Sequence, residues 1–165
     1  MRNIESDFET RRVLTALLKA TTPDTDAMTL LLGLADNIES DFELAQLLLE
    51  VSDRGLASSS TRDAYFKAVS TIASDFERRR VLTSILKRTD NSDDLRTRLL
   101  QAASTIESDF ELASFLVSFA KVYPEMSPAL REAFMKAADS IESEHEYGRV
   151  MQSSRGSARR TSGMF

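Results

Sequence analysis

Hydrophobic and polar positions follow the period of an α-helix, and one such pattern recurs along the whole chain. The segment IESDFETRRVLTALLK begins at Ile4, and related segments begin at Ile38, Ile72, Ile106 and Ile141. Successive copies are therefore 34, 34, 34 and 35 residues apart. Self-similarity at a fixed period of this size is typical of helical repeats that stack on one another.

Each copy opens with Ser-Asp-Phe-Glu or a close variant, which we call the box, and which predicts the start of a helix. In a capping box the Ser oxygen accepts from the N3 amide, and the Glu carboxylate accepts from the N-cap amide. The acidic residue after the Ser adds negative charge at the positive end of the helix dipole. The apolar residues of the first copy follow at helical spacing: Phe8, Val13, Leu14, Leu17 and Leu18. We call this predicted helix the A helix.

A second helix, the B helix, is expected to close each copy. Ser127 before Pro128 is typical of an N-cap followed by proline at the first helical position, and Ser60 and Ser92 are weaker starts. Short helices joined by short loops pack as antiparallel pairs, and successive pairs stack. We therefore predict an all-α fold, a right-handed α-solenoid of stacked antiparallel hairpins with the architecture of tetratricopeptide or HEAT repeats.

The array is expected to span residues 1–152, and residues 153–165 to form a disordered tail with several arginines and no acidic residue. In the fifth copy, His145 replaces the box Phe, and polar Ser154 and Arg155 stand at apolar positions, as in a capping repeat. The first copy has no comparable cap. We therefore expect the chain to be the C-terminal piece of a longer protein.

Composition narrows the classes of partner. The 165 residues include 26 acidic and 21 basic side chains, for a net charge of −5, so we expect no nucleic-acid partner. No apolar run approaches the roughly 18 residues that span a bilayer, so we expect no membrane insertion by this chain, and its compartment stays open. Cysteine is absent, which excludes disulfides and Cys-based zinc sites.

No pattern in the sequence predicts catalysis, a cofactor or a metal. His145 and Glu146 begin like the zinc motif H-E-x-x-H, but Arg149 stands where the second His is required. Asp7 and Glu9 are two residues apart and point to different sides of a helix, and their recurrence in the copies indicates a role in folding. We expect a chain that is not an enzyme.

Arginines follow the box in the odd-numbered copies: Arg11, Arg12, Arg78, Arg79, Arg80 and, in the fifth copy, Arg149. One interpretation is structural, with Asp7–Arg11 and Asp75–Arg79 paired at i,i+4 for about 0.2–0.5 kcal/mol each. The other is functional, with a ridge of guanidinium groups that binds an acidic peptide, a carboxylate or a phosphate. Both interpretations stay open at this point.

The copies also differ from one another in an alternating way. The second and fourth copies carry Ala45 and Ala113 near the positions of the odd-copy arginines, so the duplicated unit is interpreted as 68 residues. The box phenylalanines are expected to form a hydrophobic ladder between stacked copies: Phe8, Phe42, Phe76 and Phe110.

The run I-x-S-D-F-E-x-x-x-V-L resembles the short helical repeats appended to some bacterial membrane metallopeptidases of the antibiotic-sensor type. The resemblance covers residues 4 to about 152 and implies an accessory or sensing domain beside a protease, with no catalytic residue on this chain. The period also matches tetratricopeptide repeats, but their Trp signature is absent, because the chain contains no Trp.

Three functions are compatible with the sequence. The leading hypothesis is a scaffold that binds a protein or an acidic peptide along the A helices, with the odd-copy arginines as contacts. The second is a regulatory domain of a bacterial membrane metallopeptidase. The third is a structural unit that self-associates through an N-terminal flank around Ile4, Leu14 and Leu18.

Overall fold

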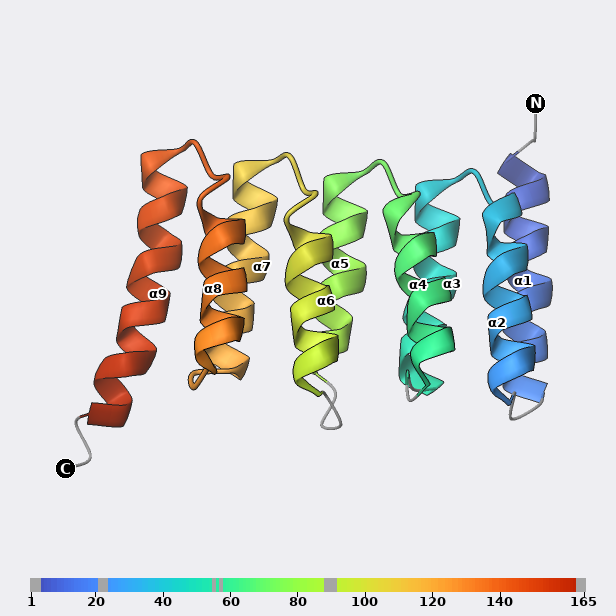
Figure 1. The fold of residues 1–165 in the computed structure, drawn as a ribbon. Helices are drawn as coiled ribbons and strands as arrows, with labels where there is room; N and C mark the ends of the chain where they lie inside the picture. The colour runs from blue at the N-terminus through green and yellow to red at the C-terminus, as the bar shows by residue number, and fades with distance from the viewer. Residues whose placement is uncertain (1–3, 21–23, 55, 57, 88–91, 163–165) are drawn as a thin grey trace. The chain divides into compact units, whose positions relative to one another are not determined.

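The computed structural model of the chain describes residues 4–20, 24–54, 56, 58–87 and 92–162 (Figure 1). These residues form nine α-helices and one short 3-10 helix, Ala35–Asn37, with no β-strand among them. The α-helices are α1 (Ile4–Ala20), α2 (Thr25–Leu34), α3 (Asp41–Arg54), α4 (Ser59–Ser70), α5 (Asp75–Leu86), α6 (Asp93–Ala103), α7 (Asp109–Val122), α8 (Pro128–Ala138) and α9 (Glu144–Ser162). The all-α fold class is confirmed.

The chain divides into two compact units, Met1–Val81 and Leu82–Phe165. In the first unit, α1 packs against α3, α2 packs against α4, and α3 contacts α4. In the second unit, α7 packs against α9, α6 packs against α8, and α7 contacts α8. The odd-numbered helices are the predicted A helices and the even-numbered ones are the B helices, so each unit joins neighbouring copies A to A and B to B.

Each unit has its own apolar core. In the first unit, Leu18, Leu47, Leu48, Val51 and Tyr65 are fully buried. The core of the second unit is more aromatic: the Phe119 ring centroid lies 6.1 Å from that of Phe115, 6.0 Å from that of Phe134 and 5.0 Å from that of Tyr123. These separations suit favourable ring pairs, so side-chain packing between the helices holds each unit together.

The B helices begin at side-chain caps. Ser92 and Ser127 accept hydrogen bonds from the N–H groups of the residues three positions later, as predicted. The start at Ser60 was wrong, because the cap of α4 is Ser58. Ser58 Oγ accepts from the Thr61 N–H at 3.1 Å and also donates to Thr61 Oγ1 at 2.7 Å. Ser60 has no threonine three positions later to form the second of these bonds.

Half of the predicted capping box is present in the second to fifth copies. The Glu N–H donates to the Ser Oγ at 3.3 Å in the boxes that begin at Ser40, Ser74, Ser108 and Ser143. In the first copy α1 begins at Ile4, so Ser6 lies inside the helix and is not its N-cap. In the boxes that begin at Ser40, Ser74 and Ser143, the other half of the box, in which Glu accepts from the Ser amide, is replaced by a different contact.

That contact comes from the aspartate of the preceding copy. Asp7 Oδ2 accepts from the N–H of Ser40 at 2.7 Å and from the N–H of Glu39 at 3.1 Å. Asp7 is only 3% exposed, and it is not paired with Arg11. The expected Asp7–Arg11 pair is therefore wrong, because the Asp7 carboxylate faces the start of the next A helix.

The same contact recurs in both units. Asp41 accepts from the N–H of Ser74 at 2.8 Å and from the N–H of Ala73 at 3.2 Å. Asp109 accepts from the N–H of Ser143 at 2.8 Å. We call Asp7, Asp41 and Asp109 the box aspartates. Each satisfies backbone donors that a helix N-terminus otherwise leaves without a partner.

The isoleucine that opens each of the second to fifth copies anchors the turn from a B helix to the next A helix. These isoleucines are buried, and each N–H donates to a carbonyl three residues earlier. The N–O distances are 2.9, 3.1, 2.9 and 3.0 Å for Ile38, Ile72, Ile106 and Ile141. The turn is therefore fixed by an apolar anchor and a backbone bond at the same residue.

The C-terminal segment differs from the expectation. Helix α9 continues to Ser162, so residues 153–162 are helical and not a disordered tail. The stretch contains one glycine, Gly156, and no proline, so nothing in it stops a helix that has already begun. Residues 163–165 of the expected tail lie outside the described residues.

The contact made by the box aspartate can be tested with Asp41→Ala. We expect the substitution to lower the free energy of unfolding by about 1–3 kcal/mol, because two backbone donors lose a charged acceptor. The measurement is urea unfolding followed by circular dichroism. The matched control is Asp26→Ala, which also removes a first-turn acid, from α2, but an exposed one. It should change stability by less than about 1 kcal/mol. Equal effects of the two substitutions would contradict this role.

Candidate binding surface

The box phenylalanines lie at the surface. Their exposed fractions are 42% for Phe8, 51% for Phe42, 50% for Phe76 and 57% for Phe110. The expected hydrophobic ladder between stacked copies is therefore wrong. Phe8, Phe42 and Phe110 each follow an aspartate that faces the next A helix. One residue turns a helix by about 100°, so the ring points away from that contact.

An arginine lies over each of these four rings. The guanidinium carbon lies within the roughly 6 Å at which a cation is attracted to an aromatic face. Its distance to the ring centroid is 5.3 Å for Arg11 on Phe8, 5.4 Å for Arg79 on Phe76, 5.7 Å for Arg80 on Phe42 and 5.5 Å for Arg149 on Phe110. In the odd copies the arginine comes from the same helix, and in the even copies it comes from the following A helix.

Arg80 and Arg149 occupy matching positions in the two units. Arg80 pairs with Glu77 of its own helix at 2.8 Å, and Arg149 pairs with Glu146 at 2.6 Å. Arg149 also donates to Ser114 Oγ at 3.4 Å. In both places a carboxylate fixes the guanidinium while its face covers a ring of the preceding copy.

Arg11 connects two A helices of the first unit. Its Nε donates to Glu43 Oε2, and Glu43 is only 7% exposed. The amide of Ser40 is bonded to Asp7, so the carboxylate of Glu43 is available to receive this cation. Arg78 also has an internal partner, since its Nη2 donates to the backbone carbonyl of Ile72.

The predicted arginine ridge is thus mostly engaged within the chain. All six arginines lie in the described part of the structure. Among them, only Arg12 is largely exposed, with 69% of its side chain accessible to solvent. Its Nη1 lies 3.7 Å from Glu9. The binding role of these arginines stays a prediction, but the surface that they build is aromatic as well as basic.

We define the aromatic–arginine surface by residues of the first unit: Phe8, Phe42 and Phe76 with Arg11, Arg79 and Arg80. Half-exposed rings offer apolar area, and the guanidinium groups above them favour carboxylates. The sequence contains a pattern that indicates this surface, namely the position of Phe8 on its helix relative to the buried leucines. Phe8 lies ten residues before buried Leu18, a rotation that leaves it about 80° out of line with that side chain. Arg11 then follows at i+3, beside the ring.

The described residues offer no evident site for a metal. No group of three or more His, Cys, Asp or Glu side chains among them is arranged to hold an ion. His145 is exposed, near the start of α9. Within the same residues, no helix is long and apolar enough to cross a membrane.

Comparisons of the chain with protein-family models, curated proteins and solved structures gave no match. The resemblance to the repeats of antibiotic-sensor-type metallopeptidases therefore stays a prediction.

The two neighbouring arginines of α1 should respond differently to truncation. Arg11→Ala leaves Glu43 buried without its cation, so we expect a loss of about 1–3 kcal/mol in the free energy of unfolding. Arg12→Ala removes an exposed side chain and should change stability by less than about 0.5 kcal/mol. Both changes in the free energy of unfolding are to be measured by urea unfolding.

A double-mutant cycle isolates the ion pair. Glu43→Gln removes the charge that Arg11 neutralises, so the double variant should lose less stability than the two single variants together. Strict additivity would show that Arg11 stabilises the chain through packing alone.

Proposed function

We propose that this protein is a non-enzymatic interaction module that binds an extended, acidic segment of a partner protein on the aromatic–arginine surface. The observation that carries the proposal is the exposure of a phenylalanine in four successive copies, each under an arginine. The proposal assigns the chain no cofactor and no nucleic-acid partner.

The chemistry of the surface supports this proposal. Aromatic side chains and arginine are enriched at protein interfaces and among the residues that contribute most to binding. Contiguous exposed apolar area on a folded protein commonly marks such a site. An apolar side chain of the partner would pack on the rings, while its carboxylates would lie near the guanidinium groups.

The repeat pattern supports an extended partner. We propose that the copies stack as 34-residue units of a right-handed α-solenoid, so that the rings of the first unit face the same side. The hydrogen bonds of Asp7 and Asp41 join residues 32 and 33 positions apart, as such stacking requires. Each copy would then add a modest increment to a binding energy shared along the partner.

Because the partner is not identified, the proposal is tested by selecting peptides that bind the protein. Random peptides of about twelve residues are selected on the parent protein, and the dissociation constant of the best binder is measured by fluorescence polarisation. We expect the selected peptides to combine acidic and apolar residues. We further expect Phe42→Ser to weaken their binding at least about tenfold, as for a residue central to an interface.

The matched control is Val122→Ser. Val122 is also an exposed apolar residue, at 45%, but it lies at the end of α7 and outside the surface. Circular dichroism establishes that both variants keep their helices. Selection of no acidic peptide, or equal affinity of parent and Phe42→Ser, would exclude this function for the surface.

A further inference from the structure

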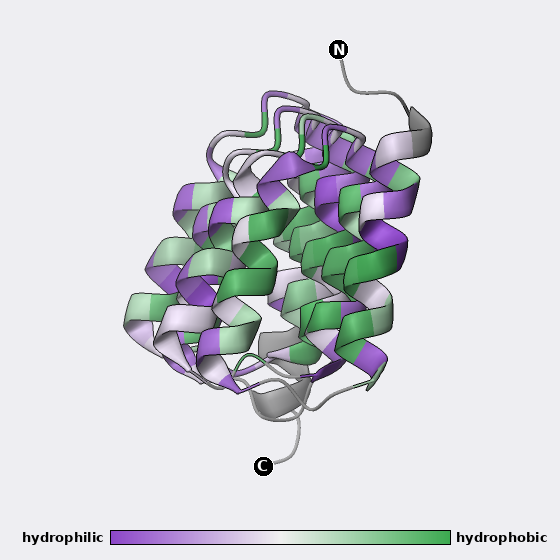
Figure 2. Ribbon diagram, turned by 90° about the vertical axis from the view of Figure 1, so that its right-hand side faces the viewer, coloured by the Kyte–Doolittle hydropathy of each residue, from purple (hydrophilic) through white to green (hydrophobic). Residues whose placement is uncertain are grey.

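Two sides of α1 expose apolar residues, and only one of them recurs in the other copies. Val13 and Leu17, on the side that does not recur, are 56% and 52% exposed. Figure 2 looks onto this end of the first unit and shows hydrophobic residues, in green, in the middle of α1. Leu47 and Val51, at the matching positions of α3, are fully buried. The apolar surface that recurs is therefore that of the box phenylalanines.

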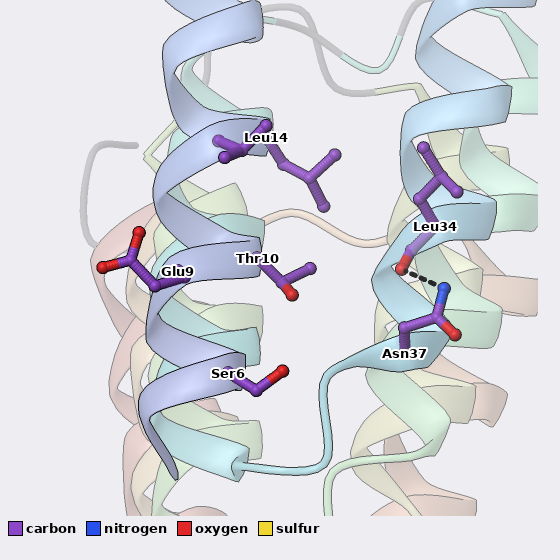
Figure 3. Close-up of a pocket in the computed structure, with 7 residues that line it drawn as sticks. Ser6, Glu9, Thr10, Leu14, Leu34 and Asn37 are labelled. Carbon is purple, nitrogen blue, oxygen red and sulfur yellow. Dashed lines mark hydrogen bonds between the residues drawn. The ribbon is translucent and has the colours of Figure 1, made fainter. Parts of the chain in front are cut away.

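The flank for which self-association is expected, around Ile4, Leu14 and Leu18, belongs mostly to the core. Leu14 and Leu18 are 3% and 0% exposed, and the side chain of Ile4 lies outside the described residues. In Figure 3, Leu14 points across an open groove of about 580 Å³ toward Leu34 of α2. Two of the three flank residues are thus not at the surface, and self-association through this end stays a prediction.

The rings of the aromatic–arginine surface lie at one level along their helices. Asp7, directly before Phe8, accepts the N–H of Ser40, which stands two residues before Phe42. Asp41 sets the same register between the second and third copies. Helix α1 packs on α3, and helices in contact lie about 8–10 Å apart. Rings of successive copies in the first unit are therefore side by side at about this distance.

A row of hydrogen-bond donors runs beside the rings. Four residues along a helix return to the same side about one turn later. In every copy, the side chain at this distance after the box phenylalanine, or after the His that replaces it, carries N–H or O–H groups: Arg12, Gln46, Arg80, Ser114 and Arg149. In the first unit, 69% of the Arg12 side chain is accessible, and Gln46 and Arg80 are half-buried. We call Arg12, Gln46 and Arg80 the donor row.

A polyproline II segment has the period of these rings. It has three residues per turn and rises about 3.1 Å per residue, so every third side chain faces the same way, at intervals of about 9 Å. A β-strand returns a side chain to the same face about every 6.7 Å, and two such steps span about 13 Å. Of the two extended conformations, polyproline II is therefore the one that matches rings about 8–10 Å apart.

The donor row distinguishes this segment from an α-helix. Seven residues of α-helix rise about 10.5 Å, which also matches the spacing of the rings. The carbonyls of an α-helix, however, already accept its own N–H groups. A polyproline II segment has no internal hydrogen bonds, so its carbonyls are free to accept from Arg12 and Gln46. The two rows together favour a partner with open carbonyls.

We propose that the partner segment binds as a polyproline II helix, which places an apolar side chain on the ring of each copy and directs carbonyls to the donor row. The inference rests on the proposed function and deepens it by naming the conformation and spacing of the partner. Proline-rich segments enter binding already ordered and dock on aromatic side chains in this way. The partner sequence is then a series of triplets, each with one apolar residue, one proline and one acidic residue.

Two peptides of equal composition test the spacing. One consists of four Leu-Pro-Glu triplets. The other has the same twelve residues, but its leucines are alternately two and four positions apart, so that neighbouring leucines face different sides of a polyproline II helix. Binding to the full chain is measured by fluorescence polarisation. We expect the triplet peptide to bind at least about fivefold more tightly, because more of its leucines reach a ring.

A substitution in the donor row tests the carbonyl contacts. Gln46→Ala should weaken binding of the triplet peptide about threefold or more, since a hydrogen-bond donor is lost. Alanine has a high helix propensity, so the variant should keep its helices, and circular dichroism checks this first. The matched control is Gln101→Ala in α6, an exposed glutamine outside the surface, which should leave the dissociation constant unchanged.

The outcomes separate this inference from the proposed function. Equal affinity for the two leucine spacings, with selected acidic peptides still dependent on Phe42, overturns the polyproline II segment and leaves the acidic partner in place. Replacement of every proline of the triplet peptide by alanine favours a helix, so equal or tighter binding of that peptide identifies a helical occupant and also overturns the inference. Equal affinity of parent and Gln46→Ala overturns the donor row. Failure of all acidic peptides, designed and selected, overturns the proposed function as well.

Discussion

The arrangement of neighbouring copies depends on one carboxylate, that of the box aspartate. It belongs to the first turn of one A helix, yet it accepts the backbone N–H groups at the start of the next, as Asp7 does for Glu39 and Ser40. A helix start leaves such donors without intrahelical partners, and an ionised acceptor forms the stronger kind of hydrogen bond with them. Because the acceptor comes from the preceding copy, helix capping and the packing of adjacent copies become a single interaction.

This interaction also decides what the rest of the box does. Since the amide of Ser40 is already bonded to Asp7, Glu43 is released from the usual capping role of a box glutamate. Glu43 instead receives Arg11, which ties the first and second copies together at a second point. With the aspartate turned toward the next helix, the adjacent phenylalanine has to face outward. The same four residues thus fix the stack on one side and place an aromatic ring in solvent on the other.

The sequence predicted the parts of this fold that depend on local pattern. The helix starts at Ser92 and Ser127 and the Ser half of four boxes are set by residues within one turn, and the structure confirmed them. The partner of Asp7 was missed because it lies 32 and 33 residues away, where only the packing of two helices brings it close. The expectation that Phe8 packs between copies rests on its hydrophobicity, whereas its angle on the helix places it outside the core. That angle, with the arginine at i+3, was available in the sequence.

Repetition separates two meanings of an exposed apolar side chain. The box phenylalanine is exposed in all four copies that contain it, so its exposure is a property of the repeat. The position of Val13 is exposed in the first copy and fully buried in α3 and α9, as Leu47 and Val150. That exposure is therefore confined to the first copy and is not a property of the repeat. The two surfaces lie on different sides of α1, because Phe8 and Val13 are five residues, or about 140°, apart on the helix.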